Sequence, residues 1–194
     1  MSGQKLATAG GGAVGVQVGA EAAPAASRRS TTEVSGTDIG LLVLRGTFGL
    51  LMAGHGLQKF FGWWGAPDFD GVSAGFAQIG YSPGRFFAVL ASGTELVAGL
   101  LFASGLLTPL ACAGIIGVMV NVIVGVSWDS GLYSQNGYEL PLMFGLVALS
   151  VAFTGPGRFA LDRGRWAAGG VAPGLTSLGL GVVSALVVLV GFKG

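Results

Sequence analysis

The sequence predicts an all-α membrane protein, built as an antiparallel four-helix transmembrane bundle with a peripheral fifth transmembrane helix. Of its 194 residues, 52% are hydrophobic and only 10% are charged, whereas soluble domains carry about a quarter charged residues. The apolar residues gather in five segments, each near the ~20 residues that cross the hydrocarbon core as a helix. The alternation typical of membrane strands is absent, and helices satisfy their own backbone groups in lipid.

The chain divides into three predicted regions. Residues 1–37 are rich in Gly, Ala, Ser and Thr, a composition that cannot bury a core, so they are predicted to form a disordered cytoplasmic arm. Residues 38–163 form the four-helix transmembrane unit. Residues 164–194 hold a Gly- and Arg-rich linker and the fifth helix.

The predicted spans follow one another closely. They cover residues 39–61, 85–107, 109–128, 138–154 and 171–192. The second and third must be antiparallel neighbours, because a tight turn ending at Pro109 joins them and proline suits a first helical position. The fourth is the shortest and is expected to thin the bilayer locally or to begin earlier. The fifth has no ionisable residue before Lys193, which predicts a peripheral packing helix.

Basic residues predict the orientation. Lys and Arg occur in the N-terminal arm and in the loop after the fourth span, and five spans place both on one side. These residues are Lys5, Arg28, Arg29, Arg158, Arg163 and Arg165. The chain is therefore expected in a bacterial-type cytoplasmic membrane, with its N-terminus in the cytoplasm and its C-terminus outside.

The composition excludes several functions. A formal net charge of +1 without a basic cluster argues against nucleic acid as a partner. The single Cys112 excludes an intrachain disulfide and an iron–sulfur site. No nucleotide-binding or hydrolase motif is present, and we expect no metal site.

Polar residues inside the spans are the best indication of function, because they are costly in lipid and face the bundle interior. Arg45, His55 and Lys59 share one face of the first span, and Glu95 lies near the middle of the second. Asn121 and Glu139 belong to the outer halves of the third and fourth spans. The sequence therefore predicts a ligand pocket, biased toward the outside, that is lined by Arg45, His55, Lys59, Glu95, Asn121 and Glu139.

Each of these residues also has a purely structural interpretation. We expect Glu95 to pair with Arg45 or His55, with Arg45 favoured as a permanent cation. Lys59 would extend to the outer interface or pair with Glu139. Asn121 would hydrogen-bond between helices, and Glu139 would suit the positive end of the helix that it opens.

Several motifs together resemble those of the DoxX-like family. They are Arg45 followed by His55-Gly56-Leu57-Gln58-Lys59-Phe60-Phe61-Gly62, Glu95 in Ala91-Ser92-Gly93-Thr94-Glu95, Asn136-Gly137-Tyr138-Glu139, and Gly155-Pro156-Gly157-Arg158-Phe159-Ala160-Leu161-Asp162. The resemblance covers about residues 38–163. It implies a four-helix membrane unit associated with quinone-linked oxidoreductase systems; the arm and the fifth helix lie outside that unit.

Three functions fit these features. The first is a membrane subunit of a quinone-linked oxidoreductase complex of the respiratory chain, with quinone in the polar pocket and redox subunits as partners. Whether such a subunit is itself catalytic stays open, because no complete catalytic or metal site is visible in the sequence. The second is a non-catalytic scaffold that anchors a partner complex. The third is a small-solute or lipid transporter, which the lack of an evident inverted repeat disfavours.

Overall fold

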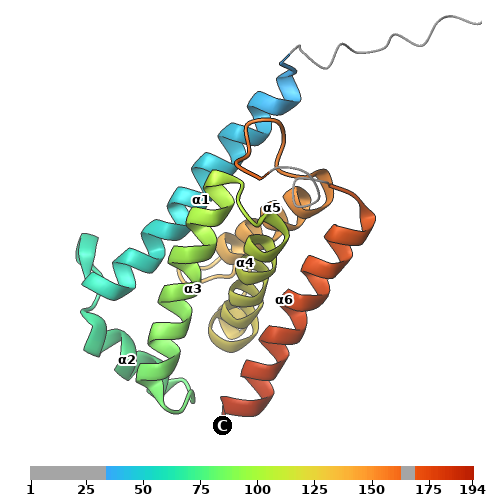
Figure 1. The fold of residues 1–194 in the computed structure, drawn as a ribbon. Helices are drawn as coiled ribbons and strands as arrows, with labels where there is room; N and C mark the ends of the chain where they lie inside the picture. The colour runs from blue at the N-terminus through green and yellow to red at the C-terminus, as the bar shows by residue number, and fades with distance from the viewer. Residues whose placement is uncertain (1–33, 163–168) are drawn as a thin grey trace, which may run out of the picture. The chain divides into compact units, whose positions relative to one another are not determined.

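A computed structural model describes residues 34–162 and 169–194. In this part of the chain every long element is a helix, and the helices run back and forth along one direction (Figure 1). The major ones are α1 (Gly36–Phe61), α2 (Phe69–Gln78), α3 (Gly84–Ser104), α4 (Thr108–Val122), α5 (Glu139–Thr154) and α6 (Val171–Phe192). A π-helical turn (Ile123–Ser127) and 3₁₀ turns (Trp63–Gly65 and Trp128–Ser130) complete the list.

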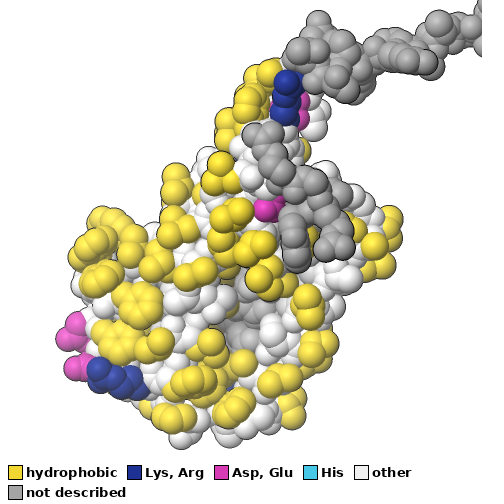
Figure 2. Space-filling model, in the orientation of Figure 1, with side chains coloured by type: hydrophobic (Ala, Val, Ile, Leu, Met, Phe, Trp, Pro, Cys, Tyr) yellow, Lys and Arg dark blue, Asp and Glu magenta, His cyan; other side chains and the backbone are white. Residues whose placement is uncertain are grey.

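The predicted spans agree with these helices to within a few residues. Four helical stretches are long and apolar enough to cross a membrane: α1, α3, Thr108–Ser130, which begins with α4, and α6. The shorter α5 has 16 residues, so it extends about 24 Å at 1.5 Å per residue. Large apolar side chains remain exposed along the flanks, among them Leu50, Val97 and Leu180. On the face in Figure 2 such side chains are widespread and charged groups are few, as lipid contact requires.

The first span begins earlier than predicted, because Ser35 and Asp38 form a capping box. The Ser35 hydroxyl accepts from the Asp38 N–H at 3.2 Å, and the Asp38 carboxylate accepts from the Ser35 N–H at 3.0 Å. Residues 36 and 37 are therefore helical. The remainder of the predicted disordered arm (residues 1–37) up to residue 33 lies outside the described residues.

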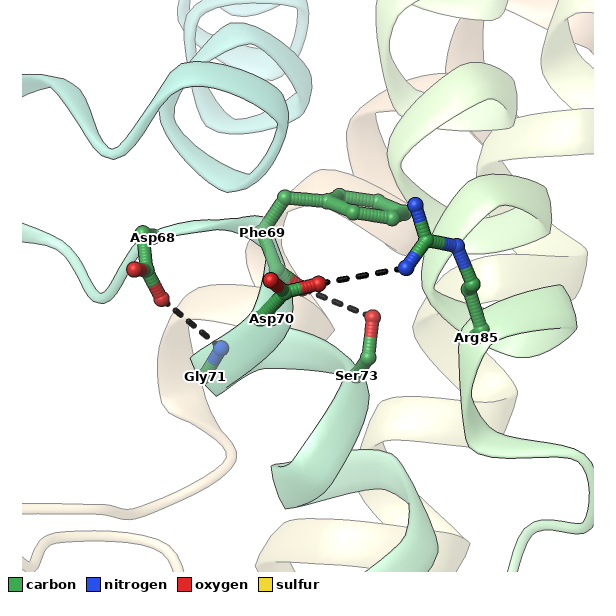
Figure 3. Close-up of polar contacts among 6 residues, drawn as sticks. All are labelled: Asp68, Phe69, Asp70, Gly71, Ser73 and Arg85. Carbon is green, nitrogen blue, oxygen red and sulfur yellow. Dashed lines mark hydrogen bonds and ion pairs between the residues drawn. The ribbon is translucent and has the colours of Figure 1, made fainter.

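Helix α2 occupies the first predicted loop and was not predicted from the sequence. Asp68 caps its N-terminus by accepting from the Gly71 N–H at 2.8 Å, and Arg85 of α3 meets Asp70 at 3.2 Å (Figure 3). The Arg85 guanidinium also lies 5.3 Å from the centre of the Phe69 ring. Arg85 and Asp70 are highly exposed, so this ion pair contributes little to stability.

Small residues bring α1 and α3 into backbone contact. A Cβ atom added to Gly99 would lie 2.5 Å from the Ala53 nitrogen and 2.7 Å from the Gly49 carbonyl oxygen. Farther along, a Cβ on Gly56 would lie 2.6 Å from the Ser92 carbonyl oxygen. Such contacts are the means by which helices associate in lipid, where no hydrophobic force drives them together. The two helices are therefore held in one register.

The fifth span, α6, packs on α4 and α5 on the side of the bundle away from α1 (Figure 1). It approaches α4 through glycine: a Cβ on Gly181 would lie 2.9 Å from the Ala113 carbonyl oxygen. At its end, the Lys193 ammonium donates to the carbonyl of Gly125 in the π-helical turn at 2.6 Å. The peripheral helix predicted from the sequence is thus fixed to α4 at two levels.

Orientation in the membrane stays a prediction. Within Val34–Gly194, α1 begins at one end of the bundle and α6 ends at the other (Figure 1). A topology reporter fused after Lys193 should respond from outside the cell, and one at Met1 only from the cytoplasm. Reporters that respond on the same side would remove the model of five crossings.

The α1–α3 contact predicts unequal effects of adding one methyl group. Gly99→Ala should lower the free energy of unfolding by about 1–3 kcal/mol, because the methyl meets backbone atoms that cannot move aside. Gly54→Ala is the matched control: nothing lies within 4 Å of its Cβ position, and alanine favours the helix. The measurement is denaturation in detergent micelles, and equal stability of both variants would contradict the contact.

Candidate functional site

A buried ion pair joins α1 and α3. The Lys59 ammonium lies 2.6 Å and 2.5 Å from the two carboxylate oxygens of Glu95. Only 2% of the Glu95 side chain is exposed, whereas Lys59 is 31% exposed. Because Glu95 lies halfway along a membrane-spanning helix, this pair places charged groups near the middle of the described bundle.

The interpretation that Lys59 extends to the outer interface is wrong. A helical side chain leans toward the N-terminus of its own helix, and for Lys59 that direction leads into the bundle. The backbone contact of Gly56 with Ser92 brings α1 close enough for the ammonium to reach Glu95 on the next turn of α3. The Lys59 side chain therefore extends toward the middle of the span.

The expected pairing of Glu95 with Arg45 or His55 is also wrong. Arg45 precedes Lys59 by about 21 Å along α1, at 1.5 Å per residue. The contact between Gly49 and Ala103 places that part of α1 beside the end of α3, well beyond Glu95. Counting residues from the centre of each span could not reveal this register, because the glycine contacts fix it.

Arg45 belongs to the opposite end of the bundle, where α3 turns into α4. Its side chain is fully buried, and none of its guanidinium nitrogens has a hydrogen-bond partner among the described residues. It lies against Gly105, which ends α3 with a positive φ of 66° and where an added Cβ would collide with the guanidinium. A cation in this place suits the negative end of the α3 dipole.

Asp162 supplies the opposite charge at this end. Its carboxylate accepts from the N–H groups of Leu107 and Thr108 at 2.9 Å and 3.0 Å, and from the Thr108 hydroxyl at 3.2 Å. It thereby caps α4, which lacks a capping side chain of its own. Its negative charge also attracts the positive charge of Arg45. Asp162 belongs to one of the motifs that resemble the DoxX-like family, but it was not among the predicted site residues. An acidic residue soon after the Gly-Pro-Gly turn was the available indication.

His55 faces α5 rather than Glu95. Its ring meets that of Phe144 edge-on with centres 6.0 Å apart, and Phe48 meets the same ring at 5.5 Å. His55 is partly exposed, so this contact does not enclose its ring completely. His55 is one turn from Lys59 on the same face of α1.

Asn121 connects α4 to α6, as its structural interpretation proposed. Its amide donates to the carbonyls of Gly117 at 3.1 Å and of Ala185 at 3.5 Å. Its amide oxygen accepts from the Tyr81 hydroxyl at 3.4 Å. Burial raises the pKa of Tyr81, which keeps this hydroxyl protonated and able to donate.

The six predicted residues therefore occupy separate places. Lys59 and Glu95 are in contact, and His55 is one turn away. Arg45 lies at the Asp162 end, Asn121 faces α6, and Glu139 is exposed in the first turn of α5. The described residues hold no group of three or more His, Cys, Asp or Glu side chains that could bind a metal ion.

Comparison with known proteins shows which family has a sequence like this one. The DoxX family model matches residues 40–128, which include Arg45, Lys59 and Glu95. An uncharacterized membrane protein of Mycobacterium tuberculosis is 32% identical over 136 residues, which cover 63% of this chain and 79% of the relative. The chain belongs to the DoxX family. No solved structure matches it.

The family match ends before α5 and α6. The ion pair between α1 and α3 thus lies inside the matched region of this DoxX protein. Glu139, Asp162 and the α6 contacts lie beyond it.

The ion pair predicts strong coupling between its two partners. Lys59→Met should lower the free energy of unfolding by about 3 kcal/mol, because it leaves the buried Glu95 carboxylate unpaired. Glu95→Met should lower it by less, because the Lys59 side chain that it leaves unpaired is partly exposed. Lys59→Met combined with Glu95→Met removes both charges and should cost much less than the sum of the single changes. Denaturation in detergent measures this cycle, and additive effects would show that the two side chains act independently.

Proposed function

We propose that this DoxX protein is a membrane subunit of a quinone-linked oxidoreductase complex, and that a quinone head binds beside Lys59 and Glu95. The observation that carries the proposal is a lysine ammonium held by a carboxylate near the middle of a span, with a histidine one turn away. Ionisable groups at this depth are expensive, and they mark ligand or proton sites in membrane proteins.

The residues fit a quinone head in three respects. Lys59 has three N–H donors and directs two interactions at Glu95, so one donor is left for a carbonyl oxygen. His55 offers a ring nitrogen from the same face of α1. The rings of Phe48 and Phe144 provide an apolar wall beside it, as is usual in small-molecule sites.

A bound quinone would supply the capacity to take up electrons and protons together. Lys59 would orient the head through its free N–H, and His55 would donate to the second carbonyl. Glu95 would hold a proton that the lysine releases or returns, because the ion pair and the neutral pair differ by the position of one proton. We propose that electrons come from a partner subunit of the complex.

A non-catalytic scaffold is the second candidate, and one observation favours it. Lys59 pairs with Glu95, and Asn121 bonds the backbone of α6, so part of the polar interior serves helix packing. Under this alternative, the lipid-facing flanks would bind partner subunits.

His55→Ala separates the two functions. It should weaken binding of decylubiquinone about tenfold through loss of one hydrogen bond, and lower quinone-linked turnover of the purified complex. Binding is measured by quenching of tryptophan fluorescence, and assembly by co-purification of partners. Asp70→Asn, on the exposed face of α2, is the control and should change neither. Unchanged turnover with intact assembly would favour the scaffold.

A further inference from the structure

The glycine residues of α1 fall into two groups with different surroundings. Gly49 and Gly56 touch the backbone of α3. The other glycines have open space within 4 Å of the position where a Cβ would lie: Gly36, Gly40, Gly46 and Gly54. Glycine inside a helix lowers helix stability, and small residues in a membrane span allow another helix to approach closely. The second group therefore calls for a contact that this chain does not make with its own described helices.

These glycines belong to a seven-residue repeat on the outer side of α1. Two series of residues recur at intervals of seven, and none of their members is buried: Gly40, Thr47 and Gly54 in one, and Val43, Leu50 and Leu57 in the other. The two series alternate at spacings of three and four, so they form one stripe along the helix, which we call the outer stripe. This period is the pattern by which two helices wind around one another in a left-handed coiled coil.

A shallow concavity lies in the middle of the outer stripe. It is lined by Val43, Gly46, Thr47, Leu50 and Leu51, all of which belong to α1. The first four occupy positions i, i+3, i+4 and i+7, the set that forms a hole for one side chain of a facing helix in knobs-into-holes packing. Because Gly46 has no side chain, the hole is open to such a knob.

The Thr47 hydroxyl differs from other exposed helical hydroxyls in the bundle. Ser150, Thr154 and Thr176 each donate to the carbonyl four residues earlier, as is usual for hydroxyls in membrane helices. Thr47 forms no hydrogen bond with residues 34–162 or 169–194, although it lies near the middle of α1. A polar group without a partner is costly in hydrocarbon. Thr47 therefore needs a partner beyond these residues.

Two properties of the outer stripe identify that partner as a second copy of this chain. Copies inserted in one membrane run in the same direction, so two α1 helices meet in parallel and the same residues face one another across a twofold axis. The Thr47 hydroxyl both donates and accepts, so two copies of it satisfy each other. The charged residues of α1 all have partners or burial within their own copy: Asp38, Arg45 and Lys59. A parallel pair thus brings no like charges together.

We infer that the outer stripe is the contact surface of a parallel homodimer in the membrane. Thr47 of each copy enters the hole on the other, and the two hydroxyls hydrogen-bond at the centre of the contact. The contact uses the side of α1 that faces away from α3, so it leaves the ion pair of Lys59 and Glu95 unchanged. The inference goes beyond the proposed function and does not depend on it.

Cysteine cross-linking tests the surface in the full-length protein, reconstituted in phosphatidylcholine liposomes. Leu50→Cys, in the outer stripe, should form a disulfide-linked dimer on mild oxidation. Val97→Cys is the matched control on the exposed face of α3 and should remain monomeric. The wild type should also give no cross-link, because its Cys112 is buried. A monomeric Leu50→Cys, or equal cross-linking of both variants, would overturn the inference.

Substitutions at the hole test its contribution to dimerisation. Gly46→Leu fills the hole and should lower the association constant about tenfold or more, since small residues allow the close approach. Gly179→Leu makes the same change on the exposed face of α6, where the Cβ position is equally open, and should leave dimerisation unchanged. Thr47→Val keeps the shape but removes the hydroxyl, and should weaken dimerisation about threefold. Single-molecule photobleaching in liposomes, over a range of protein-to-lipid ratios, measures these constants.

Both glycine variants are expected to fold, because neither Cβ position has a neighbour within 4 Å. The cross-linking comparison tests the surface without them. Equal dimerisation of Gly46→Leu and Gly179→Leu would contradict the assigned hole. If Leu50→Cys in native membranes cross-links to a different protein in place of a second copy, the outer stripe binds another subunit and the homodimer is wrong.

Discussion

The backbone contact between α1 and α3 sets the depth of every polar side chain in this membrane protein. Gly49, Gly56 and Gly99 have no side chain to hold the helices apart, so carbonyl and amide groups of one helix touch the other. With the register fixed in this way, Lys59 meets Glu95, and Arg45 meets the end of α3. A shift by one turn would separate the ion pair and leave a carboxylate unpaired in the hydrocarbon region.

The charged side chains at the two ends of the α1–α3 contact have different surroundings. At the Asp162 end, the Arg45 guanidinium is buried against the C-terminus of α3. The Asp162 carboxylate caps the N-terminus of α4. Each charge therefore lies at a helix end whose dipole has the opposite sign. Toward the α2 end, Lys59 stays partly exposed and Glu95 is buried. The first arrangement suits a fixed structural element. The arrangement of Lys59 and Glu95 leaves hydrogen-bond donors free beside an ion pair, which supports a ligand site there.

Much of the fold follows from the sequence because hydrophobicity and helix length are local properties. The five spans agree with the structure to within a few residues, and the turn at Pro109 correctly makes α3 and α4 neighbours. Helix α2 escaped notice because it is short, although Phe69, Val72 and Phe76 already have helical spacing. The site was harder to predict: the residues of one face were identified, but their partners depend on interhelical register. Glycine contacts and side-chain direction settle that register, and neither can be counted from the centre of a span.

The most direct measurement of the central claim is the distance between Lys59 and Glu95 in a lipid bilayer. Solid-state NMR on protein with ¹⁵Nζ-labelled lysine and ¹³Cδ-labelled glutamate reports dipolar contacts between ammonium and carboxylate groups. The account predicts a cross-peak corresponding to a separation of about 3–3.5 Å, as in a charge-assisted hydrogen bond, that disappears in Lys59→Met. Absence of the cross-peak from the wild type, or its survival in that variant, would contradict the account.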